Sequence, residues 1–309
     1  MIFVTVGATG GFDRLIRYID QEIAPNISEK FIAQIHDRAN YIPKNMEYFK
    51  KVNRNEYEKY ILKADLIISH AGMGVIIDCI KKKKKLIIFP RDPKRGEHSD
   101  SHQYEICKYL EGDNYDIGVV YDLNNLNHYI NKKMEEDLPL YNQSKNNLIS
   151  LRIKIGEYIY QNPNEKIFVV SSGGGHLTQM MELIDVIPMD KIFLISYTDA
   201  ALEKIDTYKI KRGDDRLVRF RATFLAPYLL MKHQPSLILT NGGGELSIPF
   251  AYFGKMMGCK IFFIETISRV DSKSVAAKSI YPIADKFLIQ WEKNLKNYGD
   301  KAEYWGSVL

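Results

Sequence analysis

The sequence lacks the cysteine pattern that disulfide frameworks and structural zinc sites need. Its three cysteines, Cys79, Cys107 and Cys259, are odd in number, far apart and without paired spacing. Disulfide scaffolds use even sets of cysteines, and zinc sites use cysteines a few residues apart. We therefore expect three reduced, mostly buried thiols and no metal site.

Long apolar runs and a strong charge of one sign are also missing. No run approaches the ~20 apolar residues that span a bilayer, and no charged-then-apolar leader precedes the first predicted strand. The balance of 43 Lys and Arg against 38 Asp and Glu gives a net charge of +5, which is too mild to indicate nucleic-acid binding. We expect a cytosolic or peripheral protein without a nucleic-acid partner, and a basic patch on an anionic membrane surface remains an alternative.

Two glycine-rich loops, at residues 7–11 and 172–176, are the most informative feature that the sequence does contain. Each follows a continuous apolar run, residues 2–6 and 167–171. A strand that ends in glycines and leads into a helix lets backbone N–H groups approach an anion closely. A chain of 309 residues suits two domains of about 150 residues each, so we expect one such loop per domain.

Strand-like and helix-like segments alternate along the chain. Predicted strands lie at residues 2–6, 31–35, 66–69 and 86–89, then at 167–171, 191–195, 217–220, 237–240, 261–264 and 287–289. Apolar runs separated by helices are typical of doubly wound parallel sheets, which bind ligands at the carboxyl ends of their strands. A helix at residues 142–160 closes the first domain and residues 161–164 form a linker, which gives domains 1–160 and 166–309.

The segment after the third predicted strand has the outline of a nucleotide-diphosphate site. It contains Ser69, His70, Gly72 and Gly74, with Asp78 further along the next helix. Small residues leave room for a diphosphate, and a carboxylate accepts hydrogen bonds from ribose hydroxyls. Alternatively, the glycines only allow close packing and Asp78 interacts with the helix dipole.

His102 and Gln103 follow the next predicted strand, and their side chains suit hydrogen bonds to sugar hydroxyls. Taken alone, His102 is typical of a capping or surface histidine.

Several motifs together resemble a known family. In the first half they are residues 3–7 with 12–16, the Ser-His-Ala-Gly-x-Gly segment 69–74, Pro90-Arg91, Gly96-Glu97-His98 and His102-Gln103. This half is similar to the donor-binding subunit of the two-subunit lipid-linked sugar transferases, which are related to the UDP-N-acetylglucosamine transferases of the peptidoglycan and dolichol pathways. The Gly-Glu-His-x-x-x-His-Gln form resembles the bacterial exopolysaccharide branch. The sequence departs from the family pattern at Val75, Asp78 and Ser101.

The second half resembles the partner subunit, so the chain resembles a fusion of both subunits that needs no separate partner. The motifs are residues 171–178, 237–244, 263–270, 284–287 and 290–291. The resemblance implies a GT-B-like α/β fold with two doubly wound parallel-sheet (Rossmann-like) domains. It also implies an inverting hexosyl- or N-acetylhexosaminyltransferase that moves a sugar from a UDP-sugar to a polyprenyl-diphosphate-linked sugar in surface polysaccharide synthesis. The protein would be peripheral on the inner, cytoplasmic face of the cell membrane. No Asp-x-Asp motif is present, which agrees with chemistry that needs no metal or other cofactor.

The resemblance assigns site residues in each half. The donor-binding candidates are Gly7, Thr9, Ser69, His70, Gly72, Gly74, Asp78, His98, His102 and Gln103. The acceptor- and diphosphate-binding candidates are Gly173, Gly174, Gly175, Asn241, Gly243 and Arg269. Arg269 has an alternative role as an ion-pair partner of Glu265.

An inverting displacement needs a base near the acceptor hydroxyl and support for the leaving UDP. His176 is the first candidate for the base or for an acceptor-diphosphate contact, because it begins a helix after three glycines. Its alternative is to orient that loop. Glu245 and Glu265 compete with it for the base, and strand-end carboxylates also brace neighbouring loops.

A basic and aromatic stretch precedes the strand predicted at residues 237–240. It contains Arg216, Arg219 and Arg221 and then the apolar segment 222–231. A membrane-surface element for a polyprenyl acceptor needs this combination, although we expect most of its apolar residues to be ordinary core.

Two other functions remain open. A nicotinamide-dependent oxidoreductase would use the loop at residues 7–11, Asp37, and the Tyr104-x-x-x-Lys108 spacing, but it lacks the third glycine and leaves the second half unexplained. A non-catalytic nucleotide or lipid-diphosphate scaffold would bind UDP without transferring sugar.

Overall fold

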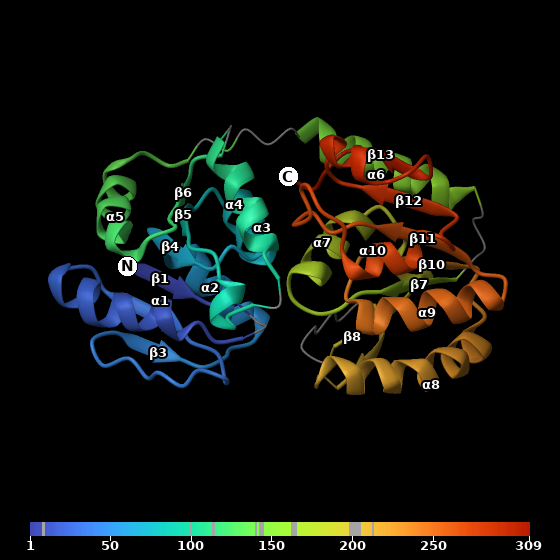
Figure 1. Cartoon of the computed structure of the whole chain (residues 1–309), viewed down its shortest axis with the longest axis horizontal. Coiled ribbons are helices and arrows are strands. Elements are labelled where there is room, and N and C mark those ends of the chain that lie inside the picture. Colours follow the sequence, from blue (N-terminus) through green and yellow to red (C-terminus); the bar gives the residue numbers. More distant parts are fainter. Residues whose placement is uncertain are drawn as a thin grey trace. The chain divides into compact units, whose positions relative to one another are not determined.

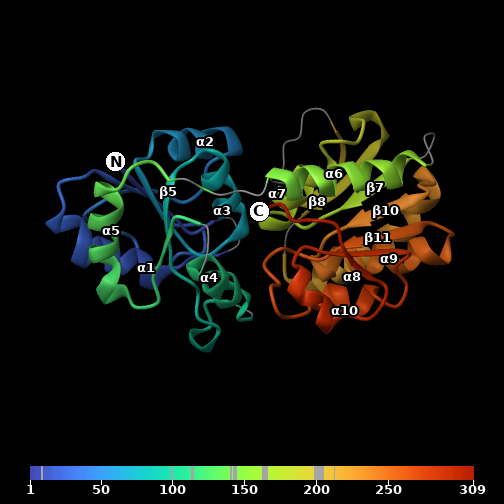
Figure 2. The same ribbon diagram turned by 90° about the horizontal axis from the view of Figure 1, so that it is seen from above.

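The computed structural model describes residues 1–7, 10–98, 100–112, 115–139, 141, 145–161, 166–197, 205–211 and 213–309. The chain forms two compact units, Met1–Gln143 and Ser144–Leu309. Each is a parallel sheet with helices on both faces (Figures 1 and 2). The predicted fold class of two doubly wound α/β domains is confirmed.

The sheet of the first unit has the order β3-β2-β1-β4-β5-β6. Its strands are β1 (Ile2–Thr5), β2 (Phe31–Gln34), β3 (Glu47–Phe49), β4 (Leu66–Ser69), β5 (Lys85–Ile88) and β6 (Ile117–Val119). All neighbouring strands pair in parallel. The order reverses between β1 and β4, and such a switch point is where doubly wound sheets bind ligands.

Successive side chains of β1 point to opposite faces of this sheet, and different helices cover the two faces. Ile2 and Val4 share a buried cluster with residues of α1 (Asp13–Tyr18) and α5 (Leu126–Glu135). Phe3 points to the other face, where it stacks on Tyr60 of α2 (Arg54–Lys63) with ring centroids 5.4 Å apart. Helices α3 (Met73–Lys81) and α4 (His102–Gly112) follow β4 and β5.

The sheet of the second unit has the order β13-β12-β11-β10-β7-β8-β9, with all neighbours parallel. Its strands are β7 (Ile167–Val170), β8 (Ile192–Tyr197), β9 (Asp206–Ile210), β10 (Leu237–Thr240), β11 (Lys260–Ile264), β12 (Lys286–Ile289) and β13 (Ala302–Tyr304). The order reverses between β7 and β10. The two sheets therefore repeat one topology, each with its own switch point.

One face of the second sheet carries a large hydrophobic core. Phe168, Ile238 and Phe263 pack there with residues of α8 (Asp215–His233), α9 (Gly244–Met256) and α10 (Val275–Ile280). Helix α7 (Gly175–Ile184) follows β7. Phe262 points to the other face, where it meets Tyr158 of α6 (Lys145–Tyr160) edge to face at 4.9 Å.

Helix α6 belongs to the second unit, so the predicted boundary after residue 160 was placed too late. The contact of Tyr158 with Phe262 and the ion pair of Arg152 with Glu182 of α7, at 3.2 Å, attach it there. The sequence indicates the helix but contains no local signal for the sheet on which it packs. Most of the predicted linker lies outside the described residues.

The strand predicted at residues 217–220 was wrong, because these residues lie within α8. Asp214 caps this helix, and its side chain accepts a hydrogen bond from the backbone N–H of Arg216 at 2.9 Å. A short apolar run does not distinguish a strand from a buried helix turn.

Strands β3, β6, β9 and β13 were not predicted. Each lies in an outer position of its sheet, where apolar patterning is weaker. Among the described helices, none is both long and apolar enough to cross a membrane.

Candidate active site

At the switch point of the first unit, glycines and a histidine ring lie in close contact. Gly7 follows β1 with φ +73, a conformation that favours glycine. A Cβ atom on Gly7 would lie 2.4 Å from Cε1 of His70, and one on Gly72 would lie 2.1 Å from Nε2 of the same ring. The imidazole of His70 therefore occupies the space that both missing side chains leave.

A buried hydrogen-bond chain fixes the orientation of this ring. The Ser69 hydroxyl donates to the backbone oxygen of Thr5 at 2.7 Å, and its oxygen lies 3.1 Å from Nδ1 of His70. Because the hydroxyl proton is already used, we assign the Nδ1 proton as the donor to Ser69, which leaves Nε2 as an acceptor. Burial and the nearby Arg91 charge hold the pKa of His70 well below its usual range, so the ring is neutral at physiological pH.

Arg91 is a buried cation beneath the first glycine loop, and it was not among the predicted site residues. Its Nη2 donates to the backbone oxygens of Val6, at 2.8 Å, and Gly10, at 2.6 Å. Burial lowers the pKa of its guanidinium to about 10, which leaves it protonated at neutral pH. The predicted donor ligand Gln103 is also tied to this residue, since its side-chain oxygen accepts from the Arg91 backbone N–H at 2.9 Å.

Asp78, the predicted ribose contact, has an arginine partner. Arg54 of α2 donates from Nη1 to Oδ2 at 2.8 Å and from Nη2 to Oδ1 at 2.6 Å. The carboxylate is buried, whereas 52% of the Arg54 side chain remains exposed. A ribose hydroxyl would therefore approach an ion pair rather than a lone carboxylate.

The other donor candidates lie on the loop into α4 and on α3. His98 and His102 are brought together, with ring centroids 4.5 Å apart, and Asp100 lies between them. Gly74 is the second residue of α3, whose N-cap residue is Gly72. Thr9 lies outside the described residues.

At the switch point of the second unit, the loops after β7 and β10 interlock. Gly174, Gly242 and Gly243 have φ of +73, +110 and +67. A Cβ atom on Gly242 would lie 2.7 Å from Cε1 of His176, and one on Gly243 would lie 2.4 Å from Cβ of Ser172. The N-cap residues of α7 and α9 are Gly174 and Gly243, so the positive ends of two helix dipoles lie at these loops.

Asn241 and Ser171 join the two loops. The Asn241 amide donates to the backbone oxygen of His176 at 2.6 Å, and its Oδ1 accepts from the Ser171 hydroxyl at 2.9 Å. His176 is the second residue of α7, and its side chain is half-buried. Gly173 precedes the N-cap, and Gly175 begins the helix. The structure thus brings His176, Asn241 and these glycines together.

The two candidate carboxylates differ in their surroundings. Half-buried Glu245 accepts a hydrogen bond from the Tyr197 hydroxyl at 2.5 Å. Glu265 is fully buried after β11 and accepts from the backbone N–H groups of Thr266 and Ser274 and from the Tyr298 hydroxyl. Burial raises the pKa of Glu265, and these hydrogen bonds oppose the rise. These contacts favour loop bracing for Glu265, whereas Glu245 keeps a partly open position.

Arg269 lies in the loop that Glu265 braces. Its Nη1 donates to the Ser272 hydroxyl at 3.2 Å, and its backbone oxygen accepts from Asn294 at 2.9 Å. Gln179 links this loop to α7, because its Oε1 accepts from the Ile267 N–H at 3.0 Å. Sequence patterns contain no signal for Gln179, since its partners lie far away along the chain.

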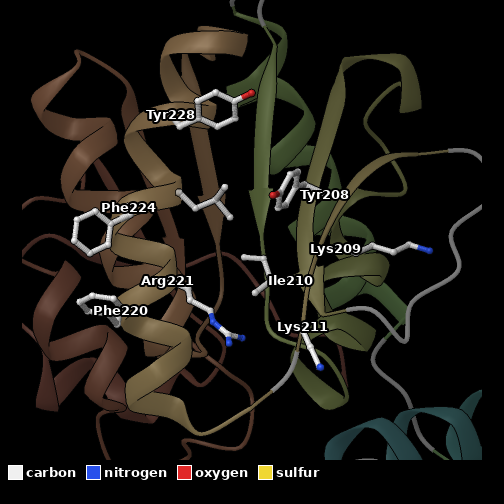
Figure 3. Close-up of a pocket in the computed structure, with 9 residues that line it drawn as sticks. Tyr208, Lys209, Ile210, Lys211, Phe220, Arg221, Phe224 and Tyr228 are labelled. Atoms are coloured by element: carbon white, nitrogen blue, oxygen red, sulfur yellow. The ribbon is translucent and has the colours of Figure 1, made fainter.

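Helix α8 has a buried face and an exposed aromatic face. Val218, Ala222, Ala226, Leu229 and Leu230 are buried, which agrees with the expected core role. Large apolar side chains on the other face are exposed: Leu217, Phe220, Phe224, Tyr228 and Met231. Part of this face lines a pocket with Tyr208, Lys209 and Lys211 at and after β9, and with Arg221 (Figure 3).

Comparisons with known proteins match each half separately. The glycosyltransferase family 28 C-terminal domain matches residues 1–157, and the oligosaccharide biosynthesis protein Alg14-like family matches residues 215–308. UDP-N-acetylglucosamine transferase subunit ALG14 of Candida albicans is 29% identical over 173 residues, which cover 47% of this chain and 78% of that protein. The human protein of that name is 24% identical over 180 residues, covering 46% of this chain and 82% of that protein.

A second kind of subunit is also similar to this chain. UDP-N-acetylglucosamine transferase subunit ALG13 of Candida albicans is 38% identical over 100 residues, which cover 32% of each protein. The family 28 match extends over more than half of the 309 residues. The chain therefore belongs to the glycosyltransferase family 28 C-terminal domain family.

Proposed function

We propose that this chain is a UDP-sugar glycosyltransferase that elongates a lipid-linked oligosaccharide and carries donor and acceptor halves in one polypeptide. The carrying observation is that two different transferase-related families match two separate doubly wound units. Each unit has its own glycine-lined switch point. A protein with only one of the two functions would need only one of these sites.

The first unit binds the UDP-sugar in this proposal. A diphosphate suits the start of α3, which begins directly after its N-cap residue Gly72, because backbone N–H groups at a helix N-terminus attract anions. The protonated Arg91 adds positive charge beneath the loop. Because relatives of both kinds are called UDP-N-acetylglucosamine transferase subunits, UDP-N-acetylglucosamine is the first donor to test.

The second unit binds the acceptor and supplies the base. His176 takes the proton of the acceptor hydroxyl, whose oxygen attacks the anomeric carbon from the side opposite UDP. The bond from that carbon to the UDP oxygen breaks, UDP leaves with the electron pair, and the configuration inverts. The helix starts at Gly174 and Gly243 suit a diphosphate of the acceptor. We propose that no metal takes part.

The exposed face of α8 supports a polyprenyl-diphosphate acceptor held at a membrane surface. Phe220 and Phe224 are 62% and 65% exposed, and Arg221 lies beside them in the pocket of Figure 3. Apolar side chains flanked by cations suit the boundary of an anionic leaflet. We propose peripheral attachment at the inner, cytoplasmic face of the cell membrane, and assembly of a bacterial surface polysaccharide as the context.

Transfer by the purified chain tests this function. The assay supplies radiolabelled UDP-N-acetylglucosamine or another UDP-hexose together with a polyprenyl-diphosphate-linked sugar in mixed micelles, with and without EDTA. We expect labelled lipid with inverted anomeric configuration, and equal rates with EDTA. UDP binding without transfer to any acceptor would favour a scaffold, and a rate that needs added metal would reject the metal-independent mechanism.

A further inference from the structure

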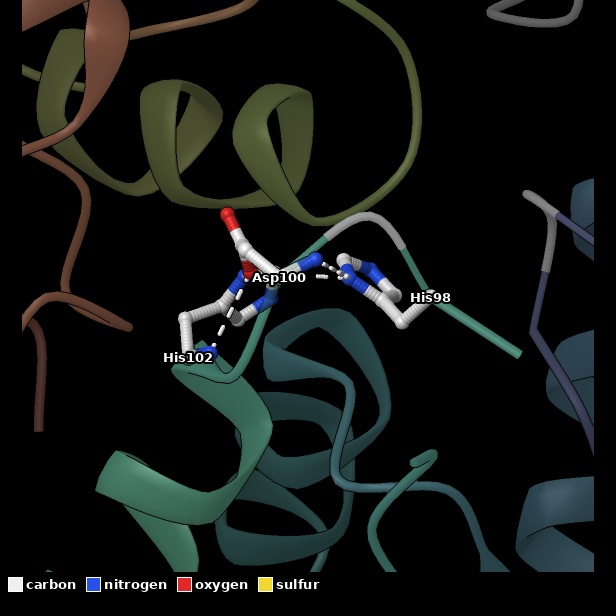
Figure 4. Close-up of side chains that lie close together, drawn as sticks. All are labelled: His98, Asp100 and His102. Carbon is white, nitrogen blue, oxygen red and sulfur yellow. Dashed lines mark hydrogen bonds and ion pairs between the residues drawn. The ribbon is translucent and has the colours of Figure 1, made fainter. Parts of the chain in front are cut away.

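His98, Asp100 and His102 form a compact cluster at the carboxyl edge of the first sheet (Figure 4). Nδ1 of His98 lies 3.5 Å from Oδ1 of Asp100, and Nδ1 of His102 contacts the same carboxylate oxygen. The two imidazole rings are nearly perpendicular, with an interplanar angle of 89°. Two nitrogens and one oxygen therefore converge on one place.

The separations of these atoms approach those of ligands around a tetrahedral ion. Zinc binds imidazole nitrogen and carboxylate oxygen at about 2.0–2.2 Å, which separates neighbouring ligand atoms by roughly 3.3 Å. All three candidate atoms lie within 4.8 Å of one another. Binding an ion requires these side chains to rotate, because the His102–Asp100 contact is closer than the separation of two zinc ligands.

The hydrogen bonding of His98 is also compatible with a metal. Its Nδ1 lies 3.3 Å from the backbone N–H of Asp100 and accepts a hydrogen bond from it. An accepting nitrogen carries a lone pair, and this unprotonated form of imidazole binds metals. An ion bound at this nitrogen would replace the hydrogen bond from the Asp100 N–H.

We propose that His98, Asp100 and His102 bind one Zn²⁺ ion, with at least one coordination position left to water. Two histidines and one carboxylate form a donor set that zinc uses in open sites. All three side chains are half-buried, so an ion can enter from solvent. The bound ion connects the segment that follows η3 (Pro93–Arg95) to the first residue of α4. Zinc binding at this site does not depend on the proposed transferase activity.

Zinc binding by the untagged full-length chain tests the proposal. Zn²⁺ alone is titrated at neutral pH in competition with a chromophoric chelator, and bound metal is counted after gel filtration. The three cysteines are buried and offer zinc little competing access. We expect one equivalent of Zn²⁺, a higher melting temperature with zinc than with EDTA, and at least tenfold weaker binding in each of His98→Ala, Asp100→Asn and His102→Ala.

His128→Ala is the matched control, because His128 is exposed on α5 of the same unit. Its zinc affinity should equal that of the wild type. Circular dichroism without metal checks that each variant folds, and the visible spectrum of the wild-type chain with Co²⁺ reports coordination independently of any substitution. Non-saturable zinc binding by the wild type, or equal affinity in the control and all three cluster variants, would overturn the proposal.

Discussion

At the scale of single residues, the two histidines at the switch points have different environments. His70 is buried, oriented by Ser69 and held neutral by burial. His176 is half-buried and lies at the start of a helix, beside a glycine whose missing side chain makes room for it. A proton acceptor must be reachable by its substrate, so this difference favours His176 as the base and His70 as a neutral wall of the donor site.

Replacing His176 by alanine should abolish transfer and leave donor binding intact. Loss of a general base slows a reaction by roughly 10²–10⁴-fold, whereas the donor candidates lie in the other unit. Initial transfer rates and UDP-induced thermal shifts separate the two effects. His233→Gln, at the end of α8, is the control and should transfer normally. Normal transfer by the His176 variant would reject this histidine as the base.

Replacing Gly72 by alanine should destabilise the first unit. Its new Cβ atom would meet Nε2 of His70 at 2.1 Å, and forcing extra volume into a packed site costs about 1–3 kcal/mol. Gly10→Ala is the matched control, since a Cβ there would meet nothing within 4 Å. Thermal unfolding of both variants gives the comparison, and an equal stability of the two would show that the His70 ring is not fixed in place.

The neutral state of His70 predicts a pH dependence of stability. Its folded pKa lies well below 6.5 because of burial, so the unfolded chain binds the proton more readily as the pH falls below about 6.5. Stability from this group is fully present above that pH and is lost progressively as the pH falls below it.

Urea unfolding above and below that pH measures this loss. The variant His70→Asn should lack this part of the pH dependence, whatever its absolute stability. His128→Ala should keep it, because that histidine is exposed. The same pH dependence in the wild type and in the His70 variant would mean that this histidine is not buried as a neutral ring.

At the scale of secondary-structure elements, helix starts and an exposed helix face carry the proposed chemistry. Helices α3, α7 and α9 each have a glycine as N-cap residue at a switch point. Helix α8 presents a buried face of small and branched residues and an exposed face of aromatics. The first feature suits diphosphates and the second suits a membrane surface.

Replacing Phe220 and Phe224 together by serine should weaken membrane binding. Burial of a phenylalanine side chain contributes about 1.5–3 kcal/mol, so each lost ring should lower the vesicle partition coefficient roughly tenfold or more. Co-sedimentation with anionic lipid vesicles measures the change. Met256→Ser, at an exposed position on α9, is the control. Unchanged sedimentation of the double variant would exclude this face as the membrane contact.

At the scale of the whole molecule, two copies of one topology carry different residues at equivalent places. The loop after the first strand contains Gly7 in one unit and residues 173–175 in the other, and both sheets reverse order beside that strand. The same architecture therefore presents a neutral histidine and a buried arginine in the first unit, but interlocked glycine loops in the second.

UDP should stabilise the full chain, and NAD should not. A ligand at 100 times its dissociation constant adds about 2.7 kcal/mol of stability to the unit that binds it, so thermal unfolding with UDP, several UDP-sugars and NAD ranks them directly. We expect a higher unfolding temperature with UDP and with one UDP-sugar.

A matched pair of variants tests the site. Asp78→Ala should lose the UDP-induced rise in unfolding temperature. Asp65→Ala should keep it, because Asp65 precedes β4 at the other end of the strand. Stabilisation by NAD alone would favour the oxidoreductase.

The amino-acid sequence by itself determined the two α/β units, the glycine loops and most of the strands that precede them, because strand runs, turns and glycines are local features. Only the tertiary structure decided that Arg91 supports the first loop, that Arg54 pairs with Asp78, that residues 217–220 belong to a helix, and that α6 packs on the second sheet. These contacts join residues far apart along the chain. They depend on strand order and on which face each helix covers, and no local pattern of residues specifies either.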